Sequence, residues 1–196
     1  MRRRLVPLPK MTRPRQSGVL PRPRLYRALD GSRTQRVVWV TGPPGAGKTT
    51  LLASYLEARK RRGLWYQLDE GDGDVATFFY LVGLAMARAS PRRTRPLPLF
   101  TPEYRASLAT FARRYFAALY ARLRPPFAVV FDNYQDVPAD SAFHEVMREG
   151  LGAIPEGGRA FVLSRAGPPP GLARLRASGV LSVARRASSW GRSATR

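Results

Sequence analysis

The stretch GPPGAGKTT, residues 42–50, decides the fold of this 196-residue chain. It fits the pattern GxxxxGK[ST] of a phosphate-binding loop, in which glycines leave backbone amides free to turn inward around an anion. The preceding run RVVWVT, residues 36–41, is β-branched and aromatic, which predicts a buried strand. Residues 47–61 carry apolar side chains at helical spacing, which predicts a helix. This order of strand, loop and helix favours a true phosphate-binding loop over a chance glycine-rich turn.

Each part of the loop has a role in binding a nucleoside triphosphate. The inward amides and the positive end of the following helix form a nest for the α- and β-phosphates. The Lys48 ammonium can reach the β- and γ-phosphate oxygens, and the Thr49 hydroxyl can bind the Mg²⁺ that bridges them. The predicted nucleotide-binding residues are Gly42, Pro43, Pro44, Gly45, Ala46, Gly47, Lys48, Thr49 and Thr50.

The predicted site also needs a carboxylate. In such sites a carboxylate at the end of a neighbouring strand binds the Mg²⁺ through a water molecule. Asp132 follows the uninterrupted apolar run FAVVF, residues 127–131, which is typical of a central parallel strand covered on both faces. We therefore predict that Thr49 and Asp132 bind the metal ion. The alternative for Asp132 is an ordinary polar strand end.

Three more residues complete the predicted catalytic set with Asp132. Many P-loop hydrolases carry an acid beside this aspartate, but here the neighbour is Asn133, whose amide can position water without taking its proton. Asp136 is the nearest alternative carboxylate, so the sequence leaves open whether the chain is an ATPase. Arg165 follows the predicted fourth strand, from which it could reach the γ-phosphate as a sensor, although it is one of 31 arginines.

Strands and helices alternate along the chain. The alternation predicts an α/β fold, a P-loop NTPase three-layer sandwich with a mostly parallel sheet of about five strands. We expect residues 1–18 to be a disordered basic lead-in with no regular element before Leu25, residues 19–183 to form the nucleotide-binding domain, and residues 184–196 to be a disordered tail. Further strands are predicted at 64–68, 127–131, 160–163 and 180–183, and further helices from Asp74, from Pro102 to about Leu123, from Asp140 or Ser141 to about Glu149, and at 172–177.

The composition limits the function classes. With no cysteine and a single histidine, disulfides, thiolate metal sites and histidine clusters are excluded. No apolar run approaches the roughly 18 residues that a membrane span requires, so we expect a cytoplasmic protein with no membrane partner.

The net charge of +21 lies mainly at the two ends. Residues 1–35 carry ten basic side chains and one acid, and residues 165–196 carry seven basic side chains and no acid. Such ends could bind DNA. Only three of the 34 basic residues are lysine, however, which favours a GC-rich coding bias as the source of the charge.

Five segments in order resemble the nucleotide-binding domain of the STAND signal-transduction ATPases, the large ATP-binding bacterial transcription activators of the maltose-activator and LuxR kind. The loop alone is generic, whereas the five segments together are fairly specific. They are VLPRPRLYRALD at 19–30, GPPGAGKTTLLASYL at 42–56, WYQLDEGDGDVATFFYLVGLA at 65–85, FAVVFDNYQDV at 127–137 and FVLSRAGPPPGLARLRASGVL at 161–181.

The resemblance implies an ATP-dependent switch in which Lys48, Thr49 and Asp132 hold Mg-ATP and Arg165 senses the γ-phosphate. It also implies that the ATP and ADP forms differ in self-association. Such regulators continue through a winged-helix domain, a helical-repeat sensor and usually a DNA-binding helix-turn-helix. We expect this chain to lack those parts, as a truncated or frameshifted product would, and to act on DNA only indirectly or through its basic tails.

The leading hypothesis is thus an ATP-binding switch domain of a bacterial signal-transduction and transcription regulator. Two alternatives stay open at this point. One is a basic nucleic-acid-binding P-loop protein that uses its arginine-rich ends. The other is a small-molecule kinase on the same fold, although nothing in the sequence marks a pocket for the phosphate acceptor.

Overall fold

The computed structural model describes residues 9–15, 20–31, 35–89 and 96–185. The strands of its central sheet are β1 (Val37–Thr41), β2 (Arg62–Gln67), β3 (Phe127–Asp132), β4 (Gly158–Ser164) and β5 (Leu181–Arg185). They lie in the order β2-β3-β4-β1-β5, and every pair of neighbours is parallel. The carboxyl ends of all five strands therefore meet at one edge of the sheet.

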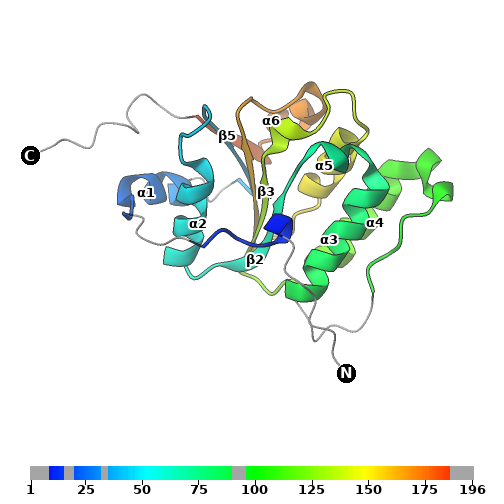
Figure 1. Cartoon of the computed structure of the whole chain (residues 1–196), viewed down its shortest axis with the longest axis horizontal. Coiled ribbons are helices and arrows are strands. Elements are labelled where there is room, and N and C mark those ends of the chain that lie inside the picture. The colour runs from blue at the N-terminus through cyan, green and yellow to red at the C-terminus, as the bar shows by residue number, and fades with distance from the viewer. Residues whose placement is uncertain (1–8, 16–19, 32–34, 90–95, 186–196) are drawn as a thin grey trace, which may run out of the picture.

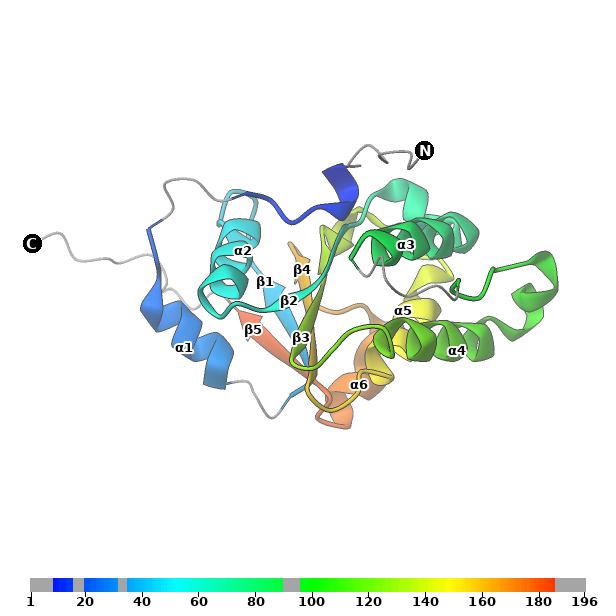
Figure 2. The same ribbon diagram turned by 90° about the horizontal axis from the view of Figure 1, so that it is seen from below.

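Helices cover both faces of this sheet (Figure 1). Figure 2 shows α1 and α2 on one side and α3, α4 and α5 on the other, so the expected three-layer α/β sandwich is confirmed. No helix of the described residues is long and apolar enough to cross a membrane. The α-helices are α1 (Pro23–Gly31), α2 (Lys48–Ala58), α3 (Val75–Ala89), α4 (Leu108–Tyr120), α5 (Phe143–Gly152) and α6 (Ala173–Ala177); the 3-10 helices are η1 (Pro9–Met11), η3 (Glu70–Gly73), η4 (Pro102–Ser107), η5 (Tyr134–Asp136) and η6 (Pro170–Leu172).

Each face of the sheet has its own hydrophobic core, and β1 contributes to both. Val38 and Val40 pack in the core beneath α1 and α2, whereas Val37 and Trp39 pack in the core beneath α3, α4 and α5. This division follows from the geometry of a strand, in which successive side chains point to opposite faces. It explains why the four residues 37–40 of β1 are all apolar and buried.

The α-helix that was predicted from Pro102 begins later in the structure. We expected a helix from Pro102, but residues 102–107 form η4 and the α-helix α4 begins only at Leu108. The Thr101 side chain makes no capping hydrogen bond to the backbone. Its hydroxyl instead bonds to Glu103, which lowers the pKa of that carboxyl group.

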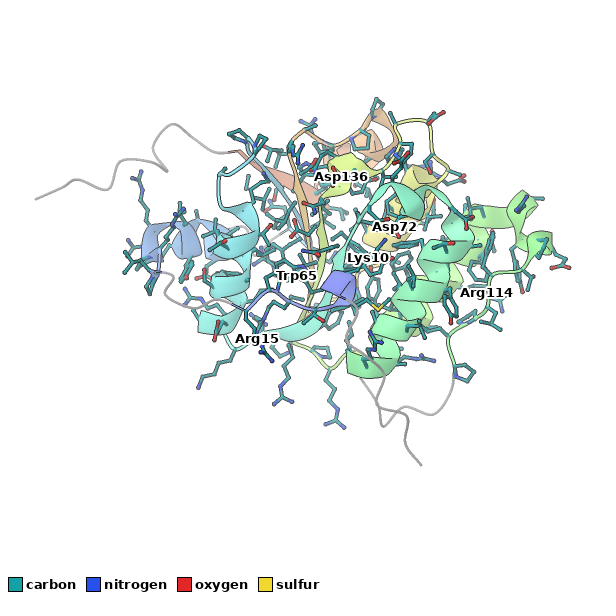
Figure 3. The ribbon with its side chains drawn as sticks, in the orientation of Figure 1. Lys10, Arg15, Trp65, Asp72, Arg114 and Asp136 are labelled. Carbon is teal, nitrogen blue, oxygen red and sulfur yellow. The ribbon has the colours of Figure 1, made fainter. Side chains whose placement is uncertain are left out.

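The expectation of no regular element before Leu25 is wrong for Pro9–Met11, which form η1. The Lys10 ammonium lies 2.6 Å from an Asp69 oxygen and 2.8 Å from an Asp72 oxygen, and Figure 3 shows Lys10 beside Asp72. At the other end, β5 continues past residue 183 to Arg185. The rest of the expected disordered segments, residues 1–8, 16–18 and 186–196, lies outside the described residues.

Candidate nucleotide-binding site

The predicted site residues gather at the carboxyl edge of the sheet. β1 continues into the P-loop, residues 42–49, while β3 ends at Asp132. The expectation that Asp132 belongs to a strand next to β1 is wrong, because β4 lies between the two. The P-loop nevertheless reaches it, since the Thr49 hydroxyl donates a hydrogen bond of 2.9 Å to Asp132 Oδ2. The two residues predicted to bind metal are therefore in direct contact.

The shape of the P-loop depends on two glycines in the left-handed backbone region. Gly45 has φ of 70° and Gly47 has φ of 73°, a conformation that other L-residues adopt only at a cost. A Cβ atom built on either glycine would meet nothing within 4 Å, so open space borders the loop at both positions. Gly47 is also the residue from which α2 begins, and its carbonyl oxygen accepts the first helical bond, from Leu51. The loop thus ends at the positive end of a helix, as an anion site requires.

The Lys48 side chain folds back over its own loop. Its ammonium donates to the carbonyl oxygens of Gly42, at 2.7 Å, and Pro43, at 3.1 Å. Desolvation lowers the pKa of Lys48, the negative charge of Asp132 raises it, and the positive charge of Arg165 lowers it. Lys48 is therefore close enough to both of these groups to interact with them electrostatically, and it is held at the loop where phosphates are expected.

Asp132 is 1% exposed, which is unusual for an ionisable side chain. Burial raises the pKa of Asp132, whereas hydrogen bonds from the Thr49 hydroxyl and the Asn133 backbone, and the Lys48 charge, lower it. Nearby Asp136 raises it further. The balance is a buried carboxyl group that costs free energy when it is ionised without a cation. Such a group is well suited to bind a metal ion or its water ligands.

The other three predicted catalytic residues are at the same edge. Asn133 follows Asp132 with a left-handed backbone, φ 62°, and its N–H donates to Asp132 Oδ1 at 3.0 Å. Asp136 ends η5 and lies in the upper part of the molecule in Figure 3. Arg165 is the first residue after β4. The fold therefore brings together every residue that was predicted to act on the nucleotide, from three separate segments.

The structure adds one polar residue that sequence reasoning missed. Gln135 in η5 accepts a 2.9 Å hydrogen bond from the backbone N–H of Arg165 and donates one of 2.9 Å to Asp136 Oδ1. It thereby joins the loop after β3 to the loop after β4. The sequence signal for a role of Gln135 was its place three residues after Asp132. Its partner Arg165 could not be predicted in this way, because it lies 30 residues further along the chain.

The residues fit a magnesium nucleotide. Mg²⁺ prefers hard oxygen ligands, and Thr49 and Asp132 present a hydroxyl and a carboxylate in contact with each other. A groove of about 770 Å³, with Met11, Arg62 and Trp65 in its lining, lies elsewhere and includes no residue of the P-loop. The P-loop is exposed to solvent at Pro43, Pro44 and Gly45, so an anion can reach its backbone amides.

A parallel sheet whose first strand opens into a phosphate-binding loop, with a carboxylate at a second strand end, defines a P-loop nucleoside triphosphatase fold. Residues 22–150 match the family model described as an AAA ATPase domain. The matched range covers more than half of the chain and includes the P-loop, Asp132, Asn133 and Asp136. The chain therefore belongs to the AAA ATPase domain family.

The chain is also similar to a bacterial transcription regulator. It is 33% identical over 169 residues to the HTH-type transcriptional regulator MalT of Cronobacter sakazakii (strain ATCC BAA-894). The aligned region covers 85% of this chain but only 18% of that relative. The similarity confirms the resemblance to the large transcription activators, and the chain corresponds to less than a fifth of the length of this relative.

Proposed function

We propose that this chain is an ATP-binding switch domain of the STAND type, belonging to a cytoplasmic system of signal transduction and transcription control. The observation that carries the proposal is the contact between Thr49 and Asp132, which places a P-loop hydroxyl against a buried carboxyl group. An ionised carboxyl group costs free energy when it is buried, and the bond from Thr49 offsets only part of that cost, because the pKa of Asp132 stays raised. A bound magnesium nucleotide would offset that cost.

In the proposed complex the P-loop amides bind the α- and β-phosphates, and Thr49 and Asp132 hold Mg²⁺ directly or through water. Lys48 exchanges its bonds to the Gly42 and Pro43 carbonyls for bonds to phosphate oxygens. Arg165 faces the γ-phosphate. Bound Mg²⁺ would neutralise charge on the phosphate oxygens.

Hydrolysis by this site should be slow. A water molecule that attacks the γ-phosphate is usually oriented by an acid next to the magnesium carboxylate, and this position holds Asn133. Asp136 is the nearest other carboxyl group and already accepts a hydrogen bond from Gln135. Slow turnover suits a switch, because the lifetime of the ATP state then sets the duration of the signal.

Calorimetric titration of the 196-residue chain with ATP and Mg²⁺ tests the proposal. We expect binding by the wild type and a loss of at least about 100-fold in affinity for Lys48→Ala, because the ammonium acts directly on the phosphates. Lys60→Ala is the matched control: it removes the same charge from an exposed position outside the P-loop and should bind like the wild type. Equal affinity of the Lys48→Ala variant and the wild type would refute nucleotide binding at this loop.

The switch itself has a separate test. We expect the mass of the particle in solution to differ between the Mg-ATP and Mg-ADP forms, as measured by light scattering after size exclusion. Lys48→Ala should abolish the difference. If both nucleotides bind to the wild type and leave the mass unchanged, the domain binds ATP without self-association as its output.

A further inference from the structure

The backbone around Arg165 is held from three sides. Gln135 Oε1 accepts from the Arg165 N–H at 2.9 Å. The Ser164 hydroxyl accepts from the Ala166 N–H at 3.2 Å, and Trp39 Nε1 donates to the Ala166 carbonyl at 2.9 Å. Two of these three contacts come from β1 and β4, the strands that support the site, and the third comes from the loop after Asp132. The start of the Arg165 side chain is thereby fixed with respect to the P-loop.

The Arg165 side chain itself has no ion pair with an acid among the described residues. Its charge lowers the pKa of Lys48, so the two cations lie near each other at the site. Two neighbouring cations repel each other unless an anion comes between them. An anionic ligand at the P-loop would reduce this repulsion.

From these contacts we infer that Gln135 is a positioning residue that sets Arg165 for the γ-phosphate, so that the preference of the domain for ATP over ADP depends on Gln135. The inference rests on the proposed function and adds the means by which the site reads the third phosphate. Gln135 acts through both ends of its amide: the carbonyl oxygen holds the Arg165 backbone, and the amino group is anchored by Asp136.

The 3-10 helix η5, which carries Gln135, is itself held by contacts with β1 and α5. Tyr134 beside it packs edge-on against Trp39, with ring centroids 4.8 Å apart, and its hydroxyl bonds to His144 Nδ1 of α5 at 2.8 Å. Gln135 is therefore presented to Arg165 from a 3-10 helix that packs on the core.

The test is the ratio of the ADP and ATP dissociation constants, measured with Mg²⁺ by calorimetry. We expect the wild type to bind ATP more tightly, and Gln135→Leu to lower the ratio by about tenfold by removing both hydrogen bonds at nearly constant volume. Gln135→Asn, whose shorter side chain cannot span the two loops, should act in the same direction. Gln35→Leu makes the same chemical change just before β1, at the opposite edge of the sheet, and should leave the ratio unchanged.

A double-mutant cycle with Arg165→Ala separates positioning from general damage. If Gln135 acts through Arg165, the pair of substitutions should lower the ratio no further than Arg165→Ala alone, whereas independent effects would add. A wild-type ratio of one, an unchanged ratio in both Gln135 variants, or additive effects would each overturn the inference. Absence of any Mg-ATP binding by the wild type would instead overturn the proposed function, and the inference with it.

Discussion

The glycine at the end of the P-loop offers a test with an internal control for backbone strain. Gly47 has φ of 73° and Gly179 has φ of 72°, and a Cβ atom on either would meet nothing within 4 Å. Gly47 precedes α2 at the proposed site, whereas Gly179 precedes β5 at the opposite end of the sheet. Substitution by alanine therefore imposes the same strain at two places, and only one of them should bind a nucleotide.

The magnitude follows from the left-handed backbone. Alanine in this region costs about 1–2 kcal/mol, and the open space at both positions adds no clash to that cost. In a domain of this size each kcal/mol lowers Tm by about 2–4 °C, so both variants should melt about 2–8 °C below the wild type. Gly47→Ala should in addition bind Mg-ATP at least about tenfold more weakly, because a relaxed loop no longer directs its amides at one point.

Thermal melts followed by circular dichroism give the stability of each variant, and calorimetric titration with Mg-ATP gives its affinity. The reasoning requires similar losses of stability and a loss of affinity in Gly47→Ala alone. Equal affinities of the two variants would show that the left-handed turn at Gly47 does not shape a phosphate site. A melt of Gly47→Ala unchanged from the wild type would refute the backbone argument itself.

Three further outcomes follow from buried contacts. The pKa of Asp132 is raised from 3.8 in the folded protein, so the folded state holds this proton more tightly than the unfolded state. The free energy of unfolding of the wild type should therefore fall, relative to that of Asp132→Asn, as the pH rises from 3.8 through the raised pKa. Urea melts between pH 3 and 8 measure the difference. Gly63→Ala places a Cβ atom 1.6 Å from a carbonyl oxygen of β3, and the lost pairing should destabilise the protein by more than about 3 kcal/mol in the same melts. Lys10→Met leaves buried Asp72 without its cation and should cost about 1–3 kcal/mol, whereas exposed Lys60→Met should cost less than about 0.5 kcal/mol.

The core of the fold could be predicted because its signals are local. Three patterns each predict their own conformation within ten residues or fewer: the apolar run before the P-loop, the glycines of the loop, and the apolar run before Asp132. The same locality predicted that Lys48 and Thr49 begin a helix directly after Gly47. The order of the strands has no such local signal, and for that reason Asp132 was placed one strand too close to β1.

The contacts that could not be predicted join distant parts of the chain. Lys10 meets Asp72 across 62 positions of sequence, and a lysine among arginines and prolines gives no sign of that partner. The bond from Arg165 to Gln135 is a backbone-to-side-chain contact, so residue types alone do not indicate it. The pattern from Pro102 predicted an α-helix, but its first six residues form a 3-10 helix. Each miss comes from tertiary geometry or local competition that propensity does not include.

The insertion of β4 between β1 and β3 has a consequence for how the domain would respond to its nucleotide. Because the strand order is β3-β4-β1, the end of β4 lies between the P-loop and Asp132, and Arg165 stands at that end. Arg165 is thus the central one of these three groups. Loss of a γ-phosphate would remove the ligand of Arg165, while the P-loop amides keep the remaining phosphates. The change would then act on the loops after β4 and β3, which Gln135 joins, and would leave α2 in place. Hydrogen exchange in the ATP and ADP states should therefore differ most in η5 and the residues after Ser164, and an effect confined to α2 would contradict this account.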